Sequence, residues 1–426
     1  MKGFLFVHLL TLLGMSLGLF YPFVSLLIYT MFGIMYPNAL WFYSLPVTFL
    51  GTGMGYSEVV AYPMIIGWFA NSCGNLNLGK SLLPISLLVL YVIHITFSLI
   101  AGNWNPLGQE IVVMNIRLVL AMVIALTLCN TVTHLRWFVW SLIFGSGFVA
   151  YELNMSYFAG FNRLQVAGYA GMDNNFFAVA MVVGATLAFF TGMAEKNLVL
   201  KFFAFLAAMF QFHVVLFSMS RGGMLGLCVV GFFTFCVLPK TGSNMLFFIV
   251  VLLVGLQLAG PSVRERFMTA FVDKSERDAS AHGRVVAWKN CLITMRENPF
   301  TGIGVGNWMP FSHERFNTTI EAHSTWLQTG ADSGIPGLTF QLGFFFVTMY
   351  RMFPYVFGRK KLPDPRLNSF AQMVVVAVMG YTVSAQFVSL YTMEITYYTM
   401  TIGLIVLKIV NLMEREQADW EEQQLA

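Results

Sequence analysis

The chain has 426 residues, of which 57% are hydrophobic and only 10% are charged, and its formal net charge is +4. A soluble domain carries roughly 25% charged residues, so the composition excludes a soluble globular protein. The apolar runs are continuous rather than alternating, which argues against a transmembrane β-barrel. We therefore predict an all-α polytopic membrane protein with a single membrane-embedded domain over residues 1–426, and we expect no nucleic-acid partner.

Thirteen apolar segments follow one another along the chain. At about 20 residues per spanning helix they predict about twelve transmembrane helices. The first segment is expected to be a retained span, because its hydrophobicity continues without a small-residue cleavage site. We expect one early segment not to span, so that both termini lie on the same side. The segments are 3–19, 21–36, 57–72, 82–99, 117–132, 136–150, 173–193, 199–219, 222–238, 244–259, 331–353, 367–390 and 392–412.

Short basic loops predict the orientation. The cluster Arg359-Lys360-Lys361, with Arg366 close behind, indicates a cytoplasmic loop because lysine and arginine accumulate on that side. If the spans alternate, Arg136 and Lys196 lie on the same side. The long polar segment 260–330 then forms an extracytoplasmic loop, and the charged tail 414–426 is cytoplasmic.

Two polar motifs open apolar segments at the outer face. Asp173-Asn174-Asn175 is either a helix N-cap, a position that Asp and Asn favour, or a substrate contact. Ser220-Arg221-Gly222-Gly223 follows an apolar helix. An arginine near hydrocarbon needs a cavity, a partner or the interface. Arg221 is therefore either a side chain that reaches the headgroups or an anion site, since a guanidinium offers a planar fork to phosphate oxygens.

The polar segment contains a predicted helix that begins after Ser280 and continues to Met295. Arg284 lies in its first turn, where backbone N–H groups favour anions. The alternative is an amphipathic helix on the membrane surface. Arg264 and Arg277 are candidates for phosphate or glycan contacts, with exposed surface charge as the alternative.

Two further motifs close the segment. Gly302-Ile303-Gly304-Val305-Gly306 lacks the βαβ context of a dinucleotide site and predicts a flexible loop. His323 lies just before the chain re-enters apolar sequence. Histidine exchanges protons near neutral pH, but a structural role is the alternative for a single histidine. The neighbouring Ser324 indicates a hydrolase only weakly, because adjacency in sequence does not make a nucleophile–base pair.

In this order, the motifs resemble those of the O-antigen ligase/polymerase superfamily of bacterial envelope glycan assembly. The resemblance covers about residues 170–410, and the N-terminal part, with Tyr21-Pro22-Phe23 and Met35-Tyr36-Pro37-Asn38, is similar to the O-glycosylation ligase branch. The motifs that carry the resemblance are Asp173–Asn175, Ser220–Gly223, Gly283–Trp288, Pro299–Gly304 and His323–Ser324.

The resemblance implies a membrane glycosyltransferase of the C type that needs no metal or other cofactor. Its donor would be a glycan on a polyprenyl diphosphate such as undecaprenyl diphosphate. The acceptor would be lipid A-core, another lipid or a protein, in lipopolysaccharide or exopolysaccharide biosynthesis at the bacterial cytoplasmic (inner) membrane. By motif, the two arginines and the histidine thought essential in ligases correspond to Arg221, Arg284 and His323. Asp173 and Asn174 would contact substrate.

The chemistry of these residues agrees with that implication. Breaking the bond between an anomeric carbon and a diphosphate develops negative charge, which Arg221 and Arg284 can stabilise. His323 can accept the proton of the attacking hydroxyl, and direct attack would invert the anomeric centre.

Three alternatives stay open. A repeat-unit polymerase shares the chemistry, although the single large external loop favours a ligase. A transporter or flippase would need ionisable residues at mid-span and paired broken helices. A non-catalytic membrane scaffold would leave the arginine–histidine set without a role.

Overall fold

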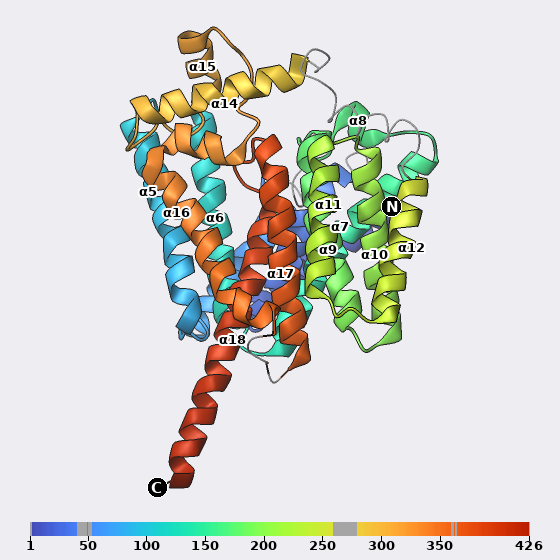
Figure 1. Cartoon of the computed structure of the whole chain (residues 1–426). Coiled ribbons are helices and arrows are strands. Elements are labelled where there is room, and N and C mark those ends of the chain that lie inside the picture. Colours follow the sequence, from blue (N-terminus) through green and yellow to red (C-terminus); the bar gives the residue numbers. More distant parts are fainter. Residues whose placement is uncertain are drawn as a thin grey trace.

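The computed structural model describes residues 2–40, 49, 53–258, 279–358, 362 and 364–425. Every regular element in these ranges is a helix, which confirms the all-α class. Six of the described helices are long and apolar enough to cross a membrane, and three shorter apolar helices accompany them. The protein is therefore a polytopic membrane protein (Figure 1).

The elements occur in the following order. They are α1 (Lys2–Gly18), α2 (Pro22–Met35), α3 (Pro37–Leu40), α4 (Tyr56–Ala70), η2 (Gly79–Ser81), α5 (Leu82–Ala101), α6 (Pro106–Leu128), α7 (Val132–Phe158), α8 (Arg163–Ala167), α9 (Asn174–Ala194), α10 (Leu198–Phe217), α11 (Arg221–Val237), α12 (Gly242–Leu258), α14 (Ala279–Glu297), α15 (Trp308–Phe316), α16 (Thr325–Val356), α17 (Pro365–Ser384), η4 (Ala385–Phe387) and α18 (Glu394–Leu425).

Each predicted apolar segment overlaps a helix, but the start of α6 differs from the prediction. The helix begins at Pro106 rather than near residue 117. Asn105 caps it, with its side-chain oxygen accepting from the Gly108 N–H at 2.7 Å, and proline is favoured at the first helical position. Arg117 therefore lies near the midpoint of α6 instead of at its end.

The interior is built around α9 and α18. The apolar part of α18, from Ile395 to Val410, is buried on almost all sides, as expected for a helix that is hydrophobic all round. Figure 1 shows α14 and α15 across one end of the bundle and the last turns of α18 projecting from the other. We call these the α14 end and the tail end.

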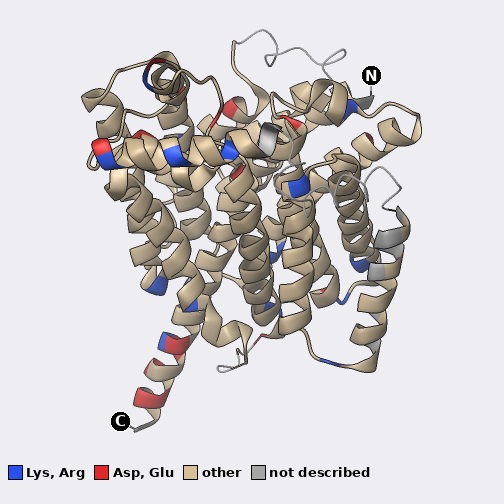
Figure 2. Cartoon of the chain, turned by 45° about the horizontal axis from the view of Figure 1, so that its top comes forward, with Lys and Arg blue, Asp and Glu red and all other residues tan. Residues whose placement is uncertain are grey.

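The two termini lie at opposite ends. The last residue of α1, Gly18, lies against Gly67 near the end of α4. Beside it, Trp68 donates to the Thr127 hydroxyl at 2.9 Å, close to the tail end of α6. Helix α1 therefore begins toward the α14 end, away from the tail (Figure 2). The expectation that both termini lie on the same side is wrong.

Basic residues gather at the tail end around a cavity lined by Arg136, Lys196 and Arg366. Arg136 pairs with Glu195 at 2.9 Å, and the whole group lies away from α14. The prediction that these three basic residues lie on the same side is thus confirmed. The stronger cluster at 359–361 lies outside the described residues.

The glycine-rich stretch 302–306 is buried and hydrogen-bonded, not the flexible loop that the sequence predicts. Its Ile303 and Gly304 N–H groups donate to the carbonyls of Ala331 and Asp332 at 3.1 and 3.0 Å. Positive φ angles of 63°, 88° and 81° at its glycines permit this path. The stretch therefore fixes α14 and the following segment against α16.

Candidate active site

Arg221, Arg284 and His323 come from three different elements at the α14 end. Arg221 is the first residue of α11, Arg284 lies in α14, and His323 immediately precedes the N-cap of α16. All three are half-buried. Arg264 and Arg277, the weaker candidates, lie outside the described residues.

A tight turn between α10 and α11 presents Arg221. Met219 adopts a left-handed φ of 58°, and the Ser220 side chain caps α11 by accepting from the Gly223 N–H at 3.2 Å. The two glycines after Arg221 allow close packing. A Cβ on Gly223 would lie 2.8 Å from that of Ala178 in α9. The small residues therefore let the start of α11 insert among its neighbours, with Arg221 at its tip.

Helix α14 lies across the end of the bundle (Figure 1) and packs against α16. It buries Ala287, Cys291 and Thr294, which recur at helical spacing, and exposes its other side. The predicted helix is confirmed, although it begins at Ala279, so that Ser280 lies within it. In α14, Arg284 lies one helical turn before Trp288.

The backbone of His323 is held in an uncommon conformation. Its φ of 45° is left-handed, which costs a non-glycine residue roughly 1–3 kcal/mol and persists only where neighbouring groups impose it. Its N–H donates to the Ser389 hydroxyl at 2.9 Å, and its carbonyl accepts from the Trp288 indole at 3.4 Å. Ser324 then caps α16 through the Leu327 N–H. Ser324 is thus a structural cap in this arrangement.

The segment Ser384–Ser389 joins the three elements. Ser384 donates to the Gly222 carbonyl at 3.1 Å, next to Arg221. The Phe387 ring lies 6.2 Å from the Trp288 ring of α14. Ser389 accepts from the His323 N–H, as described above. The segment between α17 and α18 therefore contacts His323 directly. It also contacts Gly222, next to Arg221, and Trp288, one turn after Arg284.

The surroundings of His323 favour the neutral form of its ring. Burial lowers the pKa of His323 below its usual value, and the Arg284 guanidinium lowers it further. Glu321, whose Oε2 lies 4.0 Å from Nδ1 of His323, and Asp173 act in the opposite direction on this pKa. Arg284 and Asp173 are thus each close enough to His323 to shift its pKa. A neutral imidazole in this position can accept a proton.

Asp173 and Asn174 have structural partners. Asp173 caps α9, with its Oδ1 accepting from the Phe176 N–H at 2.7 Å. Asn174 donates to the Ser218 carbonyl at 2.8 Å, which ties α9 to the turn before Arg221. The N-cap interpretation of Asp173 is confirmed, and a contact with substrate stays a prediction.

None of the sequence motifs includes Phe387 or Ser389. Both lie near the end of the predicted apolar segment 367–390. The polar residues Gln386, Ser389 and Thr392 interrupt the hydrophobic run there. That interruption was the available signal, but nothing local indicates that Ser389 meets a residue 66 positions away.

Residues 203–342 match the family model described as O-antigen ligase. The matched segment begins in α10 and ends in α16, so it includes Arg221, Arg284 and His323. The matched segment is similar to an O-antigen ligase domain, and this match implies a ligase-type glycosyltransferase enzyme. No curated protein was found to match the chain.

Proposed function

We propose that the protein transfers a glycan from a polyprenyl-diphosphate carrier to an acceptor hydroxyl on lipid A-core, another lipid or a protein. The observation that carries this proposal is the O-antigen ligase match over residues 203–342, which spans all three candidate residues. Their shared connection to Ser384–Ser389 supports a common site.

Arg221 and Arg284 hold the diphosphate in this proposal. As the anomeric C–O bond breaks, its electron pair moves to the leaving phosphate oxygen, and fixed cations lower the energy of that charge. Arginine stays protonated at every working pH and can bind two phosphate oxygens at once. Such a pair supplies the required charge without a metal ion, so the proposed reaction is metal-independent.

His323 accepts the proton in the same step. The acceptor oxygen forms the new bond to the anomeric carbon, its proton passes to the imidazole, and the diphosphate leaves from the opposite side. The anomeric centre is therefore inverted. The lowered pKa of His323 supports this role, because a neutral ring can take up the proton.

The proposed setting is the outer face of the bacterial cytoplasmic membrane. We propose that the 260–330 loop is extracytoplasmic and that the tail 414–426 is cytoplasmic. The basic residues at the tail end support this orientation. Asp173 and Asn174, which open α9 beside the turn before Arg221, are proposed to contact the diphosphate or glycan. Arg264 and Arg277 are proposed for the same role from sequence alone.

A repeat-unit polymerase is the alternative within the same chemistry. The envelope of a deletion strain distinguishes the two, because each enzyme acts on a different lipid-linked intermediate. We expect lipid-linked polymer to accumulate, as a ligase predicts. Accumulation of single lipid-linked units would instead identify a polymerase, and an unchanged glycan profile would contradict both.

A further inference from the structure

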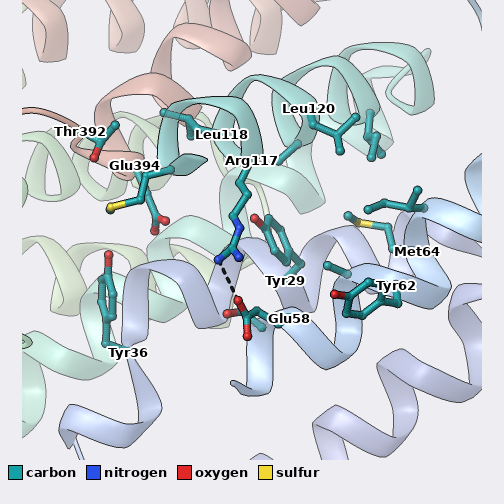
Figure 3. A pocket seen from close by; sticks show the side chains of 16 residues that line it. Tyr29, Tyr36, Glu58, Tyr62, Met64, Arg117, Leu118, Leu120, Thr392 and Glu394 are labelled. Atoms are coloured by element: carbon teal, nitrogen blue, oxygen red, sulfur yellow. Dashed lines mark ion pairs between the residues drawn. The ribbon is translucent and has the colours of Figure 1, made fainter. Parts of the chain in front are cut away.

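A second polar cavity lies among helices α2, α4, α6 and the start of α18, with a volume of about 280 Å³. Three charged side chains line it, one from each of α4, α6 and α18: Glu58, Arg117 and Glu394 (Figure 3). None of them has a role in the proposed glycan transfer. Ionisable residues inside a membrane domain are costly and are usually retained for a function.

Arg117 and Glu58 form an ion pair in this cavity, with Nη1 and Oε1 2.7 Å apart. Arg117 lies near the midpoint of α6, a helix long and apolar enough to cross the membrane. A guanidinium has five N–H donors, and one ion pair uses only part of them. Arg117 can therefore bind a second anionic group that enters the cavity.

Glu394 adds a second carboxyl group to a cavity that contains one arginine. Among the described residues, its buried Oε2 atom has no hydrogen-bond partner. Gly33 makes room for it, since a Cβ there would lie 2.8 Å from Oε2. Tyr36 lines the same cavity as Glu394. Figure 3 shows the ends of Glu394, Tyr36 and Arg117 turned toward a common space.

The cavity is polar toward the α14 end and apolar toward the tail end. Both α4 and α6 run from the α14 end to the tail end, since Asn105 before α6 contacts Val305 and Trp68 late in α4 contacts Thr127. Glu58 lies in the first turn of α4, whereas Met64 follows it toward the tail end. Along this direction, the lining changes from Tyr36, Glu58 and Glu394 to Met64, Leu120 and Ile124.

The cavity also reaches the outer surface of the bundle. The side chain of Arg117 is 58% exposed, and the lining residue Tyr62 is 58% exposed. Nearby on α4 and α6, the large apolar side chains of Ile66 and Met114 are exposed as well. Because these helices belong to a membrane domain, this surface faces lipid. A ligand can enter sideways from the bilayer.

We propose that this cavity binds the headgroup of an amine-bearing zwitterionic phospholipid of the phosphatidylethanolamine type. The phosphate binds Arg117, the ammonium donates to the Glu394 carboxyl group and to the Tyr36 hydroxyl, and an acyl chain follows the apolar lining toward the tail end. Two carboxyl groups beside one arginine make the cavity a poorer fit for a diphosphate than for a single phosphate. A choline headgroup has no N–H to donate to the Glu394 carboxyl group. This site is independent of the proposed glycan transfer.

The test measures lipid retention by the full-length protein. The protein is purified in detergent, incubated with an equimolar mixture of phosphatidylethanolamine, phosphatidylcholine and phosphatidylglycerol, and examined by native mass spectrometry. We expect retention of the ethanolamine lipid to exceed that of the other two by roughly tenfold. Glu394→Gln should lower this retention by roughly tenfold or more, because a charge-assisted hydrogen bond is lost.

The matched control is Glu414→Gln, which changes the same residue type on the same helix at the tail end, where Glu414 pairs with Lys80. It should retain the lipid as the unmodified protein does. Tyr36→Phe removes only a hydroxyl and provides a second variant should Glu394→Gln fail to fold; it should lower retention by roughly threefold. Unchanged retention in a folded Glu394→Gln or Tyr36→Phe variant overturns the proposal. So does equal binding of the three lipids, or displacement of the lipid by polyprenyl diphosphate.

Discussion

Replacing Ser389 with alanine should slow glycan transfer without weakening donor binding. The Ser389 hydroxyl accepts from the His323 N–H at 2.9 Å and thereby helps to hold a backbone with a φ of 45°. A hydrogen bond of this kind contributes about 0.5–1.5 kcal/mol. If that free energy is lost from the productive position of His323, kcat falls about two- to tenfold. Ser389 acts as a positioning residue, so KM for the donor should stay constant.

The assay is glycan transfer by the purified protein in proteoliposomes, with kcat and KM determined separately. Ser389→Thr keeps the accepting oxygen and should restore most of the rate, which a general loss of packing would not permit. Ser369→Ala, at the tail end of α17, is the control and should behave as the unmodified protein. An unchanged kcat in Ser389→Ala would refute the reasoning, as would a loss that Ser389→Thr shares.

Four other outcomes are expected. His323→Ala should lower transfer by roughly 10²–10⁴-fold while membrane insertion, followed by fractionation, stays normal; undiminished transfer would remove it as the base. Arg221→Lys keeps the charge but loses the planar fork, so transfer should fall severely, and near-normal activity would contradict the forked contact. Because the pKa of His323 is lowered, the acid limb of the pH–rate profile should lie below pH 6.5. Glu321→Gln removes a carboxylate that raises this pKa and should move the acid limb to still lower pH. A shift of the limb to higher pH would contradict the assignment of His323 as the base. Chelation with EDTA should leave the transfer rate unchanged, and a loss that Mg²⁺ restores would exclude the metal-independent mechanism.

Local sequence signals predicted the helices and one helix cap, that of Asp173. Continuous apolar runs have one structural outcome in a bilayer, because only helices satisfy the backbone within a single segment. The sequence predicted the Asp173 cap because the cap depends only on residues within one helical turn. The order of the polar motifs also indicated the O-antigen ligase domain that matches residues 203–342.

Contacts between distant segments could not be predicted from the sequence. The pairing of Glu58 with Arg117 joins two helices, and it depended on α6 beginning at Pro106, eleven residues before the predicted start near residue 117. Glu394 looked like a residue within the last apolar segment, and its place beside Gly33 follows only from packing. The contact between Ser389 and His323 likewise follows only from packing.

The most direct measurement of the central claim is glycan transfer with the purified protein, a polyprenyl-diphosphate-linked glycan and a lipid acceptor in proteoliposomes without added metal. The account predicts one polyprenyl diphosphate released for each glycan attached, with inversion at the linking carbon. It also predicts that changing Arg284 to glutamine stops both. Release and transfer that continue at the normal rate in that variant, or a product that retains the donor's anomeric configuration, would contradict it.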